Sequence, residues 1–215
     1  MIKKAHAVLG DGMLDKSNLS KTDGDIVHFL VTNKKESNYK QFADHVVFCD
    51  NAEEVINKYT DHPTELFLKV NIALASDSAA LKTHGEYIAQ LKSSILTQPL
   101  FDDCLLYRGV DLSKEELTHM ETLGTFFIPS FTSTSIHSDK IYDKNTTMVI
   151  KIPYGCKYAC SITPKLSKYF NEEREVLISC YSAFRLEKVE RVSPNKTIVS
   201  LFLDEHLSSM ENLCF

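Results

Sequence analysis

The hydrophobic pattern of the chain changes near residue 100. Before this point, apolar residues recur at the spacing of a buried helix face, as at Leu66, Val70 and Leu74. A second series of the same kind consists of Leu81, Ile88, Leu91 and Ile95. Pro63 suits the start of a helix and Pro99 its end. The pattern therefore predicts a helical part over about residues 61–99.

Beyond residue 100 the chain consists of short runs rich in β-branched and aromatic residues, separated by turn residues. Seven such runs are Leu105–Val110, Phe131–Ile136, Met148–Pro153, Lys157–Ile162, Glu175–Cys180, Phe184–Val192 and Ile198–Leu203. So many strands in about 100 residues leave little room for the crossover helices of a parallel sheet. We therefore expect an α+β fold, with a helical region followed by two packed, mainly antiparallel sheets.

The helical part (about 61–99) and the β-rich part (about 100–205) are expected to share one core and to form a single domain over residues 61–215. Residues 1–60 form an N-terminal region whose role the sequence does not indicate. Within that region, His28–Thr32 and His45–Cys49 have weaker strand patterns.

Composition limits the partners. A net charge of −5 and a pI near 5.9 argue against nucleic-acid binding, which needs a basic face. No stretch approaches the roughly 20 apolar residues of a membrane span. The apolar run Ala5–Gly10 is too short for a signal peptide, so we expect a cytosolic protein or an exported effector without a recognisable signal.

Neither the cysteines nor the histidines have metal-ligand spacing. The chain has six cysteines and eight histidines, and Cys156 with Cys160 lacks a second ligand pair at zinc spacing. A disulfide framework would require a secreted context, so we expect buried, inert thiols and no metal.

Arg108 stands in the otherwise apolar strand pattern Leu105–Val110. A guanidinium there is costly to bury unless an anion or a carboxylate receives it, and its planar fork suits a phosphate. The following Gly109 would let a ligand approach the backbone closely. Taken alone, the segment is equally compatible with an arginine on an exposed strand face.

A row of hydroxyls follows in Phe131–Ser135. Strand alternation places Ser133 and Ser135 on the face of Phe131, with Thr134 on the other face. Hydroxyls beside an aromatic ring can hydrogen-bond and stack a polar ligand, although a hydroxyl-rich edge strand would have the same composition.

Glu173 and Glu175 stand two residues apart before the apolar run Val176–Ile178. Two carboxylates on one strand face repel each other by some tenths of a kcal/mol, so this arrangement needs a reason. Beside hydroxyls and an arginine they could stabilise a positive, sugar-like transition state. A solvated acidic turn is the alternative.

These segments, in this order, resemble the arginine–serine–glutamate class of mono-ADP-ribosyltransferases, the cholera-toxin-like clade. The matching strings are Tyr-Arg-Gly-Val at 107–110, Phe-Thr-Ser-Thr-Ser at 131–135 and Glu-Arg-Glu-Val-Leu-Ile at 173–178. The sequences of the predicted helices around Val70–Leu74 and Tyr87–Leu91 are also similar to those of this class. The resemblance covers roughly residues 60–205. It implies an ADP-ribosyltransferase-like fold with an NAD-binding cleft between the sheets.

The resemblance also implies residue roles. Arg108 would hold the NAD phosphates or ribose, and the Gly109 backbone would meet the nicotinamide carboxamide. Ser133 would bind the ribose and position Glu175, which would stabilise the transition state as nicotinamide leaves. The remaining NAD contacts are expected from Thr134 and Ser135, and a stacked ring from Phe131 or Tyr142.

The acceptor is implied by Glu173, because family members that modify arginine have a glutamate here. Tyr169 and Phe170, in the loop Thr163–Glu172, would contact the target protein. The expected activity is transfer of ADP-ribose from NAD to an arginine of a target protein by a monomeric enzyme. The alternatives are an NAD glycohydrolase, a transferase with another acceptor, and a non-catalytic binding module.

Overall fold

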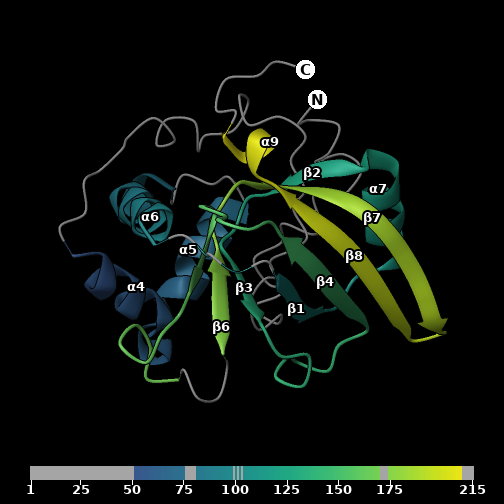
Figure 1. Cartoon of the computed structure of the whole chain (residues 1–215), viewed down its shortest axis with the longest axis horizontal. Coiled ribbons are helices and arrows are strands. Elements are labelled where there is room, and N and C mark those ends of the chain that lie inside the picture. The colour runs from purple at the N-terminus through teal and green to yellow at the C-terminus, as the bar shows by residue number, and fades with distance from the viewer. Residues whose placement is uncertain are drawn as a thin grey trace.

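We describe the fold from a computed structural model, in which the described residues are 51–75, 81–98, 100, 102, 104–169 and 174–209 (Figure 1). The two weaker strand patterns, His28–Thr32 and His45–Cys49, lie outside these ranges, as do the candidate site residues Phe170 and Glu173. Figure 1 shows the helices α4, α5 and α6 gathered at one side of the sheet, with α7 at the far end.

The helical part is as predicted. It consists of α4 (Ala52–Thr60), the short 3₁₀ helix η4 (His62–Thr64), α5 (Leu66–Ala75) and α6 (Leu81–Leu96). Helix α4 begins at an effective cap, because the Asn51 side chain accepts a hydrogen bond from the backbone N–H of Glu54. This helix extends the helical part into a segment to which the sequence pattern assigned no role.

All seven predicted strands are present, and an eighth joins them. Their bounds are β1 (Cys104–Val110), β2 (Thr125–Ile128), β3 (Thr132–Ser135), β4 (Thr146–Ile152), β5 (Ala159–Ser161), β6 (Glu175–Ile178), β7 (Ser182–Ser193) and β8 (Lys196–Asp204). Beyond residue 100, the prediction missed β2 and two helices, α7 (Lys114–Leu123) and α9 (Glu205–Ser209). Helix α7 buries few apolar residues, so its periodicity is weak, but a capping box of Ser113 and Glu116 marks its start.

The strands form one hydrogen-bonded sheet in the order β2-β7-β8-β4-β1-β3-β6-β5. Only the β4–β8 pair is parallel among the described strands, so the sheet is mainly antiparallel, as predicted. The two sheets that the sequence predicted are halves of this sheet. They join at β1 and β3, whose register is the single pair Tyr107–Ser135.

The buried apolar residues form two hydrophobic cores, and strands β5 and β6 contribute to both of them. The helix-side core packs α4, α5 and α6 against β5, β6 and Phe131, which precedes β3, and contains Ile56, Leu74 and Leu177. The second core contains Leu106, Phe126 and Ile178. Alternation along β6 therefore directs Leu177 toward the helices, and Glu175, two residues earlier, belongs to the same face.

Candidate functional site

Three neighbouring strands supply the predicted catalytic residues, since β1, β3 and β6 are adjacent in the sheet. Arg108 directly follows Tyr107, the residue of β1 that pairs with Ser135 of β3. Its Nη1 atom donates a hydrogen bond of 2.7 Å to the backbone carbonyl oxygen of Ser133. The guanidinium thus links the two halves of the sheet where the ladder between the strands ends. This contact satisfies one nitrogen of the guanidinium with a neutral carbonyl, whereas the sequence led us to expect an anion or a carboxylate.

The hydroxyl side chains of β3 are divided between the two faces of the sheet. Ser135 lies directly opposite Glu175 in the β3–β6 ladder, and Ser133 lies opposite Leu177, so both serines share the face of Glu175. Ser133 is half-buried, and its hydroxyl has no hydrogen-bond partner within the described part of the chain. Thr134 points to the other face, where its Oγ1 donates to the Val176 carbonyl at 2.6 Å. Thr134 is therefore not brought to the serine face.

Glu175 opens β6 and is 7% exposed. The residue before it, Arg174, has a φ of +49°, a left-handed conformation that side chains other than glycine rarely adopt. The Arg174 carbonyl accepts a hydrogen bond of 3.4 Å from the N–H of Ile136. The chain therefore turns sharply into Glu175, next to the end of the serine strand.

Tyr59, at the end of α4, adjoins this group, and the sequence interpretation missed it. Burial is the main cause that raises the pKa of Tyr59 well above its usual value; the Glu175 charge raises this pKa further, whereas Arg108 lowers it. Because such charge effects fade with distance, the phenol, carboxylate and guanidinium lie near one another. Arg108, which is bonded to Ser133, and Glu175 are thus both near the buried Tyr59.

Asn71 of α5 ties these elements together and was also missed as a site residue. Its side chain donates to the Tyr59 hydroxyl at 2.9 Å and accepts a hydrogen bond of 3.0 Å from the N–H of Phe131. It also donates to the Phe131 carbonyl at 3.3 Å. The available signal was a lone amide in the apolar helix 66–75, which needs a partner when it is buried.

The two candidate stacking rings differ in exposure. Phe131 is 2% exposed and packs edge-to-face on Tyr59, with 5.6 Å between ring centroids. Tyr142, in the loop between β3 and β4, is 75% exposed. The backbone of this loop passes close to Gly109, because a Cβ atom at Gly109 would lie 1.9 Å from the Tyr142 carbonyl oxygen. The sequence predicted that a ligand approaches the Gly109 backbone closely. In the structure, the chain's own loop makes such an approach.

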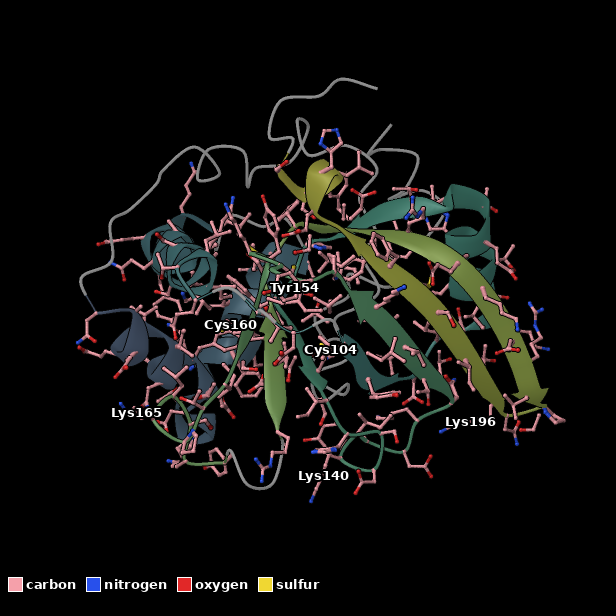
Figure 2. All side chains as sticks on the ribbon, in the orientation of Figure 1. Cys104, Lys140, Tyr154, Cys160, Lys165 and Lys196 are labelled. Carbon is pink, nitrogen blue, oxygen red and sulfur yellow. The ribbon has the colours of Figure 1, made fainter. Side chains whose placement is uncertain are left out.

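The loop between β5 and β6 reaches back to α4. The Thr60 hydroxyl donates to the Leu166 carbonyl at 2.9 Å, and Lys168 forms an ion pair of 2.6 Å with Asp61. The Lys168 ammonium also lies 5.3 Å from the centre of the Tyr169 ring. In Figure 2, Lys165 marks this loop beside α4, and Lys140 marks the loop between β3 and β4. Tyr169 is half-buried.

The described cysteines are thiols, and most of them are buried. Cys156, Cys160 and Cys180 are buried and Cys104 is half-buried. Burial, more than the nearby Glu175, raises the pKa of Cys160 to about 12. No three potential metal ligands cluster within the described ranges. In the same ranges, no helix has the length and apolar character needed to cross a bilayer.

The sequence matches no protein-family model and no curated protein, but the structure is similar to solved bacterial proteins. C3larvin toxin, an ADP-ribosyltransferase from Paenibacillus larvae, matches with a TM-score of 0.58 and 16% identity, over 77% of this chain and 100% of its own. The C3 exoenzyme from Clostridium limosum gives 0.55 and 18%, over 77% and 90%. C3stau2 from S. aureus, solved with NAD, gives 0.56 and 18%, over 76% and 91%. The chain therefore has the α+β fold of the ADP-ribosyltransferases.

Proposed function

We propose that the protein is an NAD-dependent mono-ADP-ribosyltransferase of the arginine–serine–glutamate class. One observation carries the proposal. On a chain with this fold, Arg108, Ser133 and Glu175 come from three adjacent strands, Arg108 bonds to Ser133, and both charged groups act on Tyr59. A guanidinium, a hydroxyl and a carboxylate are the groups that a dinucleotide with a reactive ribose needs.

The residues fit NAD as a co-substrate. Arg108 uses one nitrogen for the Ser133 carbonyl, and the planar fork of a guanidinium offers further donors to a phosphate or ribose oxygen. The Ser133 hydroxyl, without a partner in the described part of the chain, can donate to the nicotinamide ribose. NAD supplies the ADP-ribosyl group and loses nicotinamide when its glycosidic bond breaks.

Glu175 stabilises the positive charge that develops on the ribose as this bond breaks. Its largely buried position strengthens that interaction, because a charge acts more strongly where water is excluded. Ser135, directly across the ladder, and Ser133, diagonally placed, border the carboxylate on the same face. We assign to both serines the positioning of Glu175.

Of the two candidate rings, Tyr142 is the better stacking partner for nicotinamide. Its ring is exposed, whereas the Phe131 ring is packed in the helix-side core. We therefore assign Phe131 to holding the strand start against Asn71 and Tyr59. The Gly109 backbone stays our candidate for the nicotinamide carboxamide.

The proposed acceptor is the guanidinium of an arginine in a target protein. Glu173 lies outside the described residues, so its sequence position, two residues before Glu175, supports this choice. A carboxylate can orient a guanidinium through two parallel hydrogen bonds. In the transfer, the bond from ribose to nicotinamide breaks, a bond from ribose to the guanidinium nitrogen forms, and one proton leaves that nitrogen. With water as acceptor, the same cleavage is glycohydrolysis.

Nicotinamide release and labelling of agmatine, measured side by side, test this proposal. The wild-type protein should release nicotinamide from NAD and form ADP-ribosylagmatine. Glu175→Gln should lose both activities, whereas the control Glu187→Gln, an exposed residue of β7, should keep both. Nicotinamide release without any agmatine adduct would favour the glycohydrolase, and a wild-type protein that does not cleave NAD would overturn the proposal.

A further inference from the structure

The end of helix α4 contacts both sides of the candidate site through three consecutive residues. Tyr59 accepts a hydrogen bond from Asn71 and is near enough to Glu175 for that charge to raise its pKa. Thr60 and Asp61 contact the loop between β5 and β6, which runs on into Glu173 and Glu175. One rigid helix end therefore borders the catalytic carboxylate and also holds the loop that leads to it.

The contact of Thr60 is buried, since the residue is 6% exposed. Its hydroxyl lies 2.9 Å from the carbonyl oxygen of Leu166, 106 residues away in sequence, and 3.1 Å from that of Asn57 in its own helix, so its single proton is shared between a distant and a local acceptor. The Leu166 side chain is buried in the helix-side core. A buried carbonyl without a donor is costly, so this bond selects one position of the loop.

Asp61 adds a second contact at the surface. Its carboxylate receives Lys168 at 2.6 Å, and the same ammonium lies over the Tyr169 ring. An exposed ion pair adds little stability by itself. Its geometric effect is to restrict Tyr169, the last described residue before the segment that contains Glu173.

Cleavage and transfer make different demands on this loop. The groups proposed to cleave NAD lie on β1, β3 and β6, which the ladder and the Arg108–Ser133 bond hold in place. The acceptor must additionally be placed against the ribose, and the loop that ends at Tyr169 leads into the sequence position of Glu173, the proposed acceptor-binding residue. The position of the loop should therefore matter more for the acceptor than for NAD.

We propose that Thr60 and Asp61 are positioning residues that set acceptor use, by fixing the loop 163–169 against the end of α4. This inference rests on the proposed transferase function. It predicts that loosening the α4 contacts separates NAD cleavage from transfer to a protein.

The test compares Thr60→Val with Thr60→Ser, which keeps the hydroxyl, and Asp61→Asn with the charge exchange Asp61→Lys/Lys168→Asp. Each variant is assayed with NAD alone, with agmatine, and with unfractionated lysate protein and labelled NAD. In Thr60→Val and Asp61→Asn, nicotinamide release should change less than about twofold. Labelling of lysate protein should fall about three- to tenfold, the effect of one lost hydrogen bond. Thr60→Ser and the charge exchange should restore labelling.

Equal losses of cleavage and protein labelling, or unchanged labelling in both variants, would overturn the inference. Thermal melting of each variant identifies a general loss of folding, and hydrogen exchange at residues 166–169 measures the loop itself. Unchanged exchange in Thr60→Val would also count against it. A wild-type protein that releases no nicotinamide would instead refute the proposed function.

Discussion

The Arg108 guanidinium donates a 2.7 Å hydrogen bond to the backbone carbonyl of Ser133. This bond lies one residue beyond the single register pair that joins β1 to β3. Elsewhere in the sheet, neighbouring strands are joined by several backbone pairs. A side chain therefore completes the link between the two halves at the point where NAD is proposed to bind.

Replacing Arg108 by lysine should impair NAD binding without unfolding the protein. A lysine keeps the charge but lacks the fork that serves a carbonyl and a phosphate together. We expect the KM for NAD to rise at least about tenfold and stability to fall by ~1.5–3 kcal/mol, the range for one charged hydrogen bond. Steady-state nicotinamide release and urea unfolding measure the two effects. The control Arg191→Lys, on the exposed end of β7, should change neither; an unaltered KM in Arg108→Lys would contradict the phosphate role.

Changing Glu173 to glutamine should separate the two halves of the reaction. The variant keeps the hydrogen-bonding shape but loses the charge that orients an incoming guanidinium. We expect NAD cleavage to stay within a few-fold of wild type and arginine transfer to fall at least about tenfold. Agmatine labelling at saturating NAD is the measurement. Transfer at the wild-type rate would show that Glu173 does not position the acceptor.

A methyl group at Gly109 should displace the loop that carries Tyr142. A Cβ atom there would lie 1.9 Å from the Tyr142 carbonyl oxygen, so the backbone of one segment must move. We expect Gly109→Ala to lose ~1–3 kcal/mol of stability, as overpacking does, together with NAD affinity. Adding Tyr142→Ala should not restore stability, since the clash is with the backbone. Restoration in the double variant would place the conflict in the tyrosine ring instead.

The sequence predicted the strands and the Arg108–Ser133–Glu175 order because strand alternation and short motifs are local. It did not predict Asn71 or Tyr59, since their bonds join residues far apart in the chain. The Asn71–Phe131 bond, for example, spans 60 residues. Alternation placed Thr134 off the serine face, and its bond to Val176 confirms that placement. The pattern identified Gly109 as a site of close approach but could not predict Tyr142 as the segment that approaches.

Removing the Asn71 amide should loosen the strand that carries Ser133. In Asn71→Leu, the Phe131 N–H and the Tyr59 hydroxyl lose their partner in α5. Groups left unsatisfied near a core cost ~1–3 kcal/mol, so the free energy of unfolding should fall by about that amount. NAD cleavage should fall as well, because Ser133 follows Phe131 by two residues. Asn71→Asp, which keeps the acceptor oxygen, should lose less stability; equal losses would place the effect in the amide N–H donors, which both variants lack.

Alkaline conditions should destabilise the fold from about pH 9, because two thiols are buried. Burial is the main cause that raises the pKa of Cys156 and of Cys160 from 9.0 to about 12. Above pH 9 the unfolded chain loses these protons while the folded chain keeps them, so stability falls as pH rises toward 12. The stabilising effect is complete below pH 9, where both states hold the protons.

Urea unfolding between pH 8 and 10, in the presence of reductant, measures this decline. Tyr59 and Tyr87, with an ordinary pKa of 10.0, begin to contribute as the pH approaches 10, so the comparison with cysteine variants separates the part due to the thiols. Each thiol adds at most ~1.4 kcal/mol per pH unit to the slope. Cys160→Ala should flatten the decline, and combining it with Cys156→Ala should flatten it further. Both thiols should also resist alkylation in the folded protein at pH 8, because only the thiolate reacts. A level stability from pH 8 to 10 in the wild type, or rapid alkylation of Cys160, would mean that these thiols are not buried as described.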